Sequence, residues 1–161
     1  MMKTLKLIFL IAFFFLFSSN AAFAQASKAS PKITAIRAQL FYDTTGKFST
    51  DILAAKDFAL WNTIIGEGSA ESPSTSTLVT IEISGTDNAG TSKLELTATG
   101  DKGKVLLKKI VGLDLLERTK FYVPFWFYNT GCEKIKLSAR LFIRNIAGAP
   151  VVKTIPFACG E

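Results

Sequence analysis

Histidine is absent from the 161-residue sequence, and cysteine occurs only twice. The lack of histidine excludes the usual serine and cysteine triads, the ordinary general base near neutral pH, and most zinc and copper sites. Nucleophile elbows and glycine-rich phosphate loops are missing too. We therefore expect the protein not to be an enzyme and to need no cofactor. A hydrolase with paired carboxylates stays open, but the acids fall in turns or, like Glu82 and Glu95, on the solvent faces of expected strands.

Aspartates with the D-x-D spacing of many calcium sites are also absent. Five aspartates lie in expected turns or near strand ends: Asp43, Asp51, Asp57, Asp87 and Asp101. Aspartate in a turn commonly hydrogen-bonds to the nearby backbone and stabilises the turn itself. Turn formation is the favoured interpretation for these residues, and we expect no metal.

The one long apolar run, Leu7–Phe17, lies near the N-terminus and has 11 residues, whereas a helix needs about 20 to span a bilayer. Lys3 and Lys6 precede the run, and Ala22–Ala24 follows it with the A-x-A pattern of a signal-peptidase site. The sequence thus predicts a cleaved signal peptide over residues 1–24 and no membrane anchor. We expect an exported protein, either periplasmic or extracellular, from a bacterium.

The chain beyond the signal peptide has the size of one domain. Two of the 19 basic residues belong to the signal peptide, which leaves 17 basic against 13 acidic residues, a net charge of +4 over 137 residues. We expect a flexible leader over residues 25–31 and a single domain over residues 32–161. The positive excess is mild. The lysines of its densest cluster alternate with apolar residues, as on the solvent face of a strand, so nucleic acid is not expected as a partner.

Short segments of alternating apolar and polar residues fill this domain, separated by turns rich in Gly, Ser, Asp and Asn. Alternation with a period of two predicts β-strands with one buried face. The expected strands cover residues 33–42, 47–52, 57–65, 78–84, 93–99, 104–111, 121–128, 135–143 and 151–157, and residues 112–120 form either one helical turn or a bulged crossover. Seven to nine short strands predict an all-β fold, an antiparallel β-sandwich of immunoglobulin-like or C2-like type, with a closed small barrel as the alternative.

The aromatic segment Phe121–Tyr128, with the sequence FYVPFWFY, has large apolar residues on both faces. We therefore predict a strand that is covered on both sides. Pro124 lacks the N–H of a ladder hydrogen bond, so it belongs at an edge, a strand start or a bulge. Since a covered strand should not lie at an open edge, we predict a bulge at Pro124.

The two cysteines, Cys132 and Cys159, are almost equally far in sequence from the centre of the last hairpin. If Leu141 faces Val151 across this hairpin, then Glu133 faces Cys159, and Cys132 is one position away. The Cα atoms can then come within the roughly 4.4–6.8 Å that a disulfide needs, and paired cysteines in an exported chain usually form one. We predict a disulfide that ties the C-terminal tail to the turn after the aromatic segment.

Five residues are candidates for a binding site: Trp61, Asn62, Glu67, Trp126 and Tyr128. The tryptophans and neighbouring tyrosines could stack on a sugar ring or hold an apolar partner. Core packing is nevertheless the favoured interpretation, because small sandwiches normally bury one or both of their tryptophans. The 12-residue polar loop over residues 66–77 is long enough to be either functional or disordered, and it is the first place to look for a site.

Together these features favour an exported, non-enzymatic β-sandwich that acts as a binding or structural module, with another exported protein as its partner. A small carbohydrate-binding module that uses exposed aromatic side chains is the alternative. The exposure of the two tryptophans discriminates between them, because a glycan binder needs flat aromatic rings on its surface. The fold alone does not decide the function.

Overall fold

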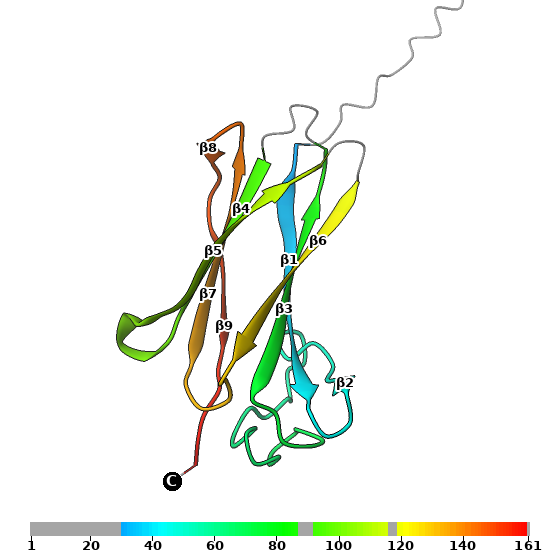
Figure 1. Ribbon diagram of the computed structural model, residues 1–161, viewed down its shortest axis with the longest axis vertical. Helices are drawn as coiled ribbons and strands as arrows, with labels where there is room; N and C mark the ends of the chain where they lie inside the picture. Colours follow the sequence, from blue (N-terminus) through cyan, green and yellow to red (C-terminus); the bar gives the residue numbers. More distant parts are fainter. Residues whose placement is uncertain (1–29, 87–91, 116–118, 161) are drawn as a thin grey trace, which may run out of the picture.

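The computed structural model describes residues 30–86, 92–115 and 119–160, and these ranges contain nine strands and one short 3-10 turn (Figure 1). The strands are β1 (Lys32–Tyr42), β2 (Lys47–Phe48), β3 (Ser76–Ser84), β4 (Ser92–Thr99), β5 (Val105–Leu113), β6 (Lys120–Tyr128), β7 (Ile135–Ile143), β8 (Ile146–Ala147) and β9 (Val151–Ile155). The 3-10 turn η1 (Asp101–Gly103) closes the β4–β5 hairpin. The predicted signal peptide and most of the leader lie outside the described residues.

The strands form two antiparallel sheets. The first sheet has the order β2-β1-β3-β6, and the second has the order β5-β4-β7, with β8 and β9 both paired to β7. The chain crosses from the second sheet to the first between β5 and β6, so this connection is a crossover; residues 116–118 within it lie outside the described part. The predicted antiparallel β-sandwich is confirmed.

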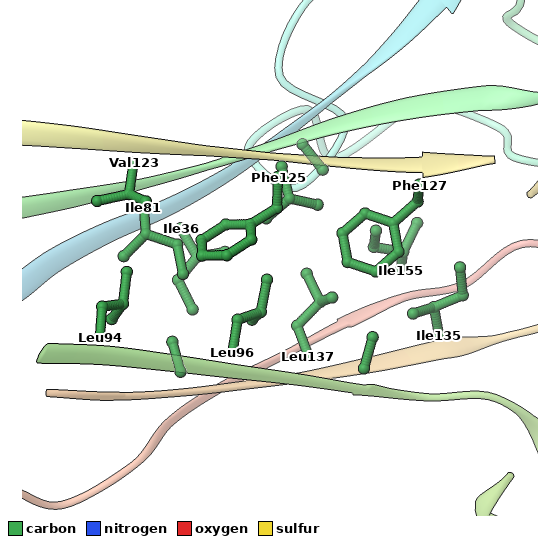
Figure 2. Close-up of a cluster of buried hydrophobic side chains, with 14 of the residues drawn as sticks. Ile36, Ile81, Leu94, Leu96, Val123, Phe125, Phe127, Ile135, Leu137 and Ile155 are labelled. Atoms are coloured by element: carbon green, nitrogen blue, oxygen red, sulfur yellow. The ribbon is translucent and has the colours of Figure 1, made fainter. Parts of the chain in front are cut away.

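The core fills the space between the two sheets (Figure 2). The alternation of the sequence places one set of side chains from β1, β3, β4 and β7 into this space, as predicted, whereas both residues of β2 and of β8 are exposed. The labelled members are Ile36, Ile81, Val123, Phe125 and Phe127 from the first sheet and Leu94, Leu96, Ile135, Leu137 and Ile155 from the second. Burying each large apolar side chain stabilises the fold by roughly 1.5–3 kcal/mol relative to leaving it exposed.

β6 is an edge strand, and only its inward face is buried. The buried residues are Val123, Phe125 and Phe127, and the exposed ones are Tyr122, Pro124, Trp126 and Tyr128. The prediction of a strand covered on both sides is therefore wrong. The predicted bulge is wrong as well, because the register with β3 continues unshifted past the pair Thr80–Pro124. An edge strand has one unpaired side, where a proline removes no ladder hydrogen bond.

Residues 57–65 form turns instead of the predicted strand. The backbone of Asn62 has a φ of 49°, in the left-handed region that an extended strand does not use. Trp61 makes only one isolated parallel bridge, with Ala158. The β-branched residues of this segment predicted extended structure, but a single left-handed residue in its middle ends any strand.

The predicted strand over residues 47–52 is shortened to the two residues of β2. Asp51 begins the following turn, and its Oδ1 accepts the N–H groups of Ala38 (3.0 Å) and Leu53 (3.1 Å). This aspartate therefore stabilises a turn, as favoured above.

The pairing of β7 with β9 differs by two residues from the expected alignment. Val151 lies opposite Ala139, not opposite Leu141. The difference arises because β8 first folds back on β7 through Arg144 and Asn145, whose φ angles are 51° and 66°. A shift of two residues keeps every side chain on its predicted face, so the inward pattern of both strands is preserved.

The disulfide between Cys132 and Cys159 is confirmed, with Cα atoms 4.5 Å apart. A structural disulfide indicates an oxidising environment of the kind that exported proteins occupy. Among the described residues, no helix has the length and hydropathy required to cross a membrane.

Candidate functional site

The structure places the five candidate binding residues in two groups. Trp61, Asn62 and Glu67 lie in the connection between β2 and β3, whereas Trp126 and Tyr128 lie on β6. Trp61 is 49% exposed and Trp126 is 38% exposed. The expectation that one or both tryptophans fill the core is therefore wrong, and the chain has two separate surfaces that display an indole.

Asn62 and Glu67 hold the C-terminal tail in place. Asn62 Nδ2 donates to Glu67 Oε2 (2.8 Å), and the Gly160 N–H donates to Asn62 Oδ1. The backbone N–H of Asn62 donates to Ala158 O (2.8 Å), and that of Ala158 donates to Leu60 O (3.0 Å). The side-chain amide of Asn62 is thus engaged within the molecule, which gives this residue a structural role beside the disulfide.

The loop that follows Asn62 is tied to the sandwich by hydrogen bonds. Ser74 N–H donates to Thr63 O (2.9 Å), and Glu71 N–H donates to the hydroxyl of Tyr42 (3.3 Å). The hydroxyl of Ser74 also donates to Phe41 O (2.8 Å). These contacts attach the loop to β1 and to the turn around Thr63, at the lower end of the first sheet in Figure 1.

Four aromatic side chains meet on the outer face of the first sheet, and we call Phe41, Phe48, Trp126 and Tyr128 the aromatic patch. The ring centroids are 5.3 Å apart for Phe41–Phe48, 5.7 Å for Phe41–Trp126 and 5.8 Å for Phe48–Trp126. Trp126 and Tyr128 are 6.4 Å apart, with ring planes 12° from parallel. Contacts at these distances are attractive, so the rings fix one another's positions while Tyr128 stays 69% exposed.

The register of the strands brings the four rings of the aromatic patch together. Phe41 lies opposite Phe48 on one side and Ser76 on the other, and Ser76 lies opposite Tyr128. Residues that are directly opposite in antiparallel strands point to the same face. Three strands therefore bring aromatic rings from distant parts of the sequence to one end of the outer face.

Sequence reasoning missed Phe41 and Phe48. Phe41 lies between Leu40 and Tyr42, which both point inward, so alternation placed it outward. A large aromatic residue at an outward strand position was the available signal. Phe48 had no comparable signal, because its strand has only two residues.

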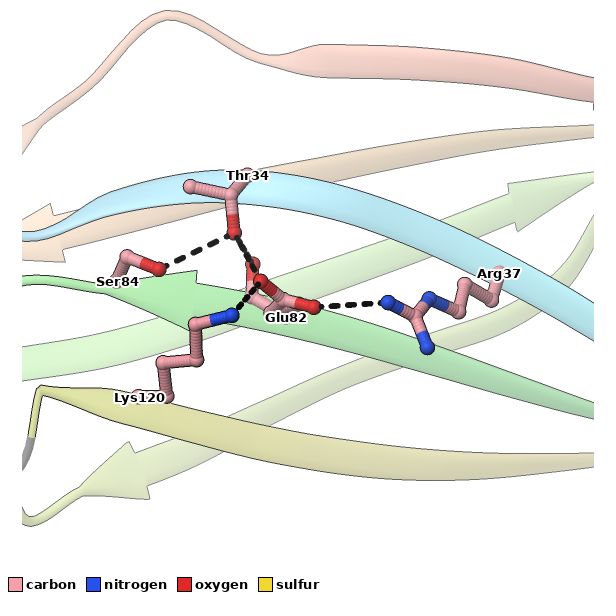
Figure 3. A network of polar contacts seen from close by, with 5 residues as sticks. All are labelled: Thr34, Arg37, Glu82, Ser84 and Lys120. Carbon is pink, nitrogen blue, oxygen red and sulfur yellow. Dashed lines mark hydrogen bonds and ion pairs between the residues drawn. The ribbon is translucent and has the colours of Figure 1, made fainter.

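Glu82 lies farther along the same face and is buried, contrary to the expectation that it faces solvent. Its carboxylate accepts a hydrogen bond from Thr34 Oγ1 (3.0 Å) and pairs with Arg37 Nη2 (3.0 Å) and Lys120 Nζ (3.4 Å) (Figure 3). The hydrogen bond from Thr34 is the main cause that lowers the pKa of Glu82 below 4.5; desolvation opposes it, and the charges of Lys120 and Arg37 add to it.

Positive charge lies next to the aromatic patch. The Arg37 side chain is 53% exposed, and Arg37 shares a row with Thr80 and Pro124, next to the row that contains Trp126. Arg37 and Lys120 carry two positive charges and both contact the single negative charge of Glu82, so the three side chains have a net positive charge. No group of three or more His, Cys, Asp or Glu residues suited to a metal occurs in the described part of the chain. This face therefore offers apolar contact beside positive charge.

No protein-family model matches the sequence, and no curated protein matches it either. Among solved structures, a β-glucuronidase of Bifidobacterium dentium, complexed with coumarin-3-O-glucuronide, is similar with a TM-score of 0.44 and 9% sequence identity. The match covers 80% of this chain but only 18% of the glucuronidase chain. A likeness at this level indicates neither a family nor an activity.

Proposed function

We propose that the protein is an exported, non-enzymatic binding module that holds another exported protein through the aromatic patch. The observation that carries this proposal is the contact of four aromatic rings on an outer sheet face, with Phe48, Trp126 and Tyr128 left exposed to solvent. Clustered exposed apolar side chains commonly mark interaction sites. Tryptophan and tyrosine are also the side chains that most often dominate the energy of protein interfaces.

Pro124 restricts how the partner binds. A partner strand added to β6 would need backbone N–H groups along the open edge of β6. Pro124, at the centre of this strand, has no backbone N–H. The partner therefore contacts the face of the first sheet through side chains. Because Arg37 lies beside the patch, the fitting partner surface is an apolar side chain with a carboxylate next to it.

A comparison of three forms of the protein tests this proposal. Wild type, the double variant Trp126→Ala/Tyr128→Ala and the control Val105→Ala/Ile110→Ala are immobilised and incubated with exported proteins of the native organism. The control removes exposed apolar side chains of β5, in the second sheet. A protein held by wild type and control is then purified for titration calorimetry.

We expect the patch variant to bind that purified protein about 30-fold more weakly or worse, the loss of one interface hot spot of roughly 2 kcal/mol. The control should bind like wild type, and higher salt should weaken binding because a charge contributes. Equal binding by the patch variant would refute the assigned surface.

A carbohydrate-binding module is the second candidate, and one observation favours it. The rings of Trp126 and Tyr128 are exposed and only 12° from parallel, an arrangement that could stack on consecutive sugar units. Affinity electrophoresis in gels that contain soluble polysaccharides tests it. Retardation of wild type, with normal migration of Trp126→Ala, would favour the glycan; normal migration of both would dismiss it for the polysaccharides used.

Export to a bacterial periplasm or beyond it belongs to the same proposal, supported by the disulfide and by the predicted signal peptide. N-terminal sequencing of the protein from the native periplasm and medium tests both points. We expect a mature chain that begins at Gln25. Recovery in the cytoplasm with Met1 in place would contradict export.

A further inference from the structure

The edges of the two sheets differ in how well they are protected against the addition of a strand. In the first sheet, the β6 edge carries Pro124. At the opposite edge, β2 has only two residues, Ser49 and Ile52 hydrogen-bond to β1 beyond it, and a bulge interrupts β1 between Ile33 and Ala35. Prolines, short strands, bulges and covering loops all prevent an edge from pairing.

In the second sheet, one edge is protected and the other is open. β9 has five residues and lies between Pro150 and Pro156. β5, at the other edge, pairs with β4 in unshifted register from Leu107 to Leu113, and no other described strand pairs with it. This run contains no proline. Backbone N–H and C=O groups alternate between the two sides of an antiparallel strand, so about half of those in the run point away from β4.

The side chains along the β5 edge are accessible on both faces of the sheet. Ile110 is 58% exposed on the outer face. Lys109 belongs to the opposite row, because it lies across from the inward residue Leu96, and yet it is exposed as well. Figure 1 shows the turn of the β4–β5 hairpin extending to the side of the other strands. The first sheet therefore leaves this part of β5 uncovered.

The hairpin of β4 and β5 has an excess of positive charge. Residues 93–113 contain five lysines against the two acids Glu95 and Asp101, a net charge of +3. Lys109 makes no ion pair in the described part of the chain, and Lys108, with its side chain 61% exposed, lies 3.6 Å from Glu95. Two copies of this edge would bring lysines of both chains close together, and like charges on neighbouring strands repel. A strand with acidic side chains is complementary.

We propose that the β5 edge binds an extended acidic segment of another protein, which adds a strand to the second sheet. The backbone of this segment hydrogen-bonds to the open side of Leu107–Leu113. Its apolar side chains lie against Ile110 and Val111, and two acidic side chains lie opposite Lys108 and Lys109. Main-chain hydrogen bonds give such strand addition its affinity, and the side chains give it specificity. This binding does not depend on the aromatic patch, which belongs to the first sheet.

Titration of the isotope-labelled protein with the end-blocked peptide Thr-Thr-Val-Val-Glu-Glu-Val tests the proposal in nitrogen–proton correlation spectra. In antiparallel pairing with Leu107–Leu113, the two glutamates of the peptide lie opposite Lys109 and Lys108. The same peptide with two lysines in place of the glutamates is the charge control. Two N-methylated forms of the acidic peptide test the backbone, one modified at its second, fourth and sixth residues and the other at its third, fifth and seventh. Only one of these sets faces β5 in a paired strand.

We expect the acidic peptide to bind at one site per chain, to shift the amide signals of β5 and to leave those of β6 and β9 in place. One N-methylated form should bind about tenfold more weakly or worse, because it loses the hydrogen bonds to β5, and the other should bind like the unmodified peptide. The lysine peptide should bind about fivefold more weakly or worse, since its charge repels the edge.

Two lysine variants of the protein separate the edge from general positive charge. Lys108→Gln/Lys109→Gln should weaken binding of the acidic peptide about fivefold. Lys134→Gln/Lys153→Gln, which removes two exposed lysines outside β5, should bind like wild type, and so should Trp126→Ala. The proposal is overturned if the acidic peptide does not bind, if the two N-methylated forms bind alike, or if the lysine peptide binds equally well. Signal shifts at β6 or loss of binding in Trp126→Ala would also overturn it, by placing the peptide on the first sheet.

Discussion

Glu82 shows at the scale of one residue how the outer face of the first sheet accommodates a buried charge. Its side chain is only 9% exposed, yet Thr34, Arg37 and Lys120 all contact the carboxylate. Burial of an ion is tolerated when hydrogen bonds and opposite charges replace the lost water. The alternation of β3 placed Glu82 outward correctly, but it could not show that neighbouring side chains would cover it.

The lowered pKa of Glu82 predicts how stability depends on pH. A carboxyl group whose pKa is lower in the folded protein stabilises the fold above its unfolded pKa, and this contribution is lost as the pH falls through the folded value. We expect Glu82→Gln to be less stable than wild type at pH 7, and the difference to shrink as the pH falls below the ordinary pKa of 4.5 and through the lower pKa of the folded protein, where Glu82 becomes protonated. Urea unfolding at pH 7 and pH 3 measures it. A difference that stays constant between the two pH values would contradict the ion-pair account.

Gly131 makes a second prediction at this scale. Its φ is +117°, and a Cβ at this position would collide with Thr63 Oγ1 and approach Ile64 Cγ2 to 2.9 Å. We expect Gly131→Ala to lower the free energy of unfolding by about 3 kcal/mol, since strain and overpacking add. Gly46→Ala is the matched control, because Gly46 also has a positive φ but open space around it. Equal losses in chemical denaturation of the two variants would show that the close packing at Gly131 contributes nothing.

β6 combines the properties of an edge strand and of an aromatic surface. Its sequence predicted a strand at the right place but with both faces covered, whereas only the inward residues Val123, Phe125 and Phe127 are buried. What could not be predicted is that nothing in the described chain covers its outer face. Alternation says which side chains share a face, but coverage depends on strand order, and strand order is set by contacts between distant segments.

The proline in β6 protects this edge against pairing with another chain. We expect Pro124→Thr to self-associate at concentrations where wild type does not, because threonine restores an N–H at the centre of the open edge and favours extended structure. Sedimentation velocity over a concentration series measures the change. Tyr122→Thr, on the same strand with Pro124 in place, is the control and should sediment like wild type. A monomeric Pro124→Thr would show that the edge is protected by something else.

The connection between β2 and β3 shows where the sequence pattern predicts the wrong secondary structure. Trp61, Ile64 and Ile65 favour a strand by their side-chain preferences, but the left-handed Asn62 turns the chain within the same segment. Asparagine tolerates that conformation better than most residues, so it was the one local signal available. The reason for the turn is not local, because Asn62 binds the C-terminal tail, almost a hundred residues later.

The disulfide connects elements of the sandwich that are separated in the sequence. It joins the turn after β6 to the C-terminal tail, which in turn contacts the connection between β2 and β3. The spacing of the cysteines predicted this bond even though the assumed register was off by two residues, because such a shift leaves both ends of the hairpin close together. The fold class was equally accessible from the sequence, whereas the aromatic patch was not, since it needs the register of four strands at once.

Closing a 27-residue separation with a disulfide predicts a stability contribution of roughly 3–4 kcal/mol from the reduced entropy of the unfolded chain. We expect Cys132→Ser to lower the free energy of unfolding by about this amount in urea denaturation. Reduced wild type should match the variant, and native wild type should show no thiol reactive towards Ellman's reagent. Two reactive thiols in the native protein, or a variant as stable as wild type, would contradict the assignment.

Binding through the aromatic patch is tested most directly by the two indole N–H signals of the protein in a nitrogen–proton correlation spectrum. The chain has two tryptophans, Trp61 and Trp126, so a Trp61→Phe variant assigns both signals at once. When the captured partner is titrated into labelled protein, we predict that the Trp126 signal shifts or broadens while the Trp61 signal stays in place. A shift of Trp61 with an unchanged Trp126 would contradict the account and move the site to the loop after β2.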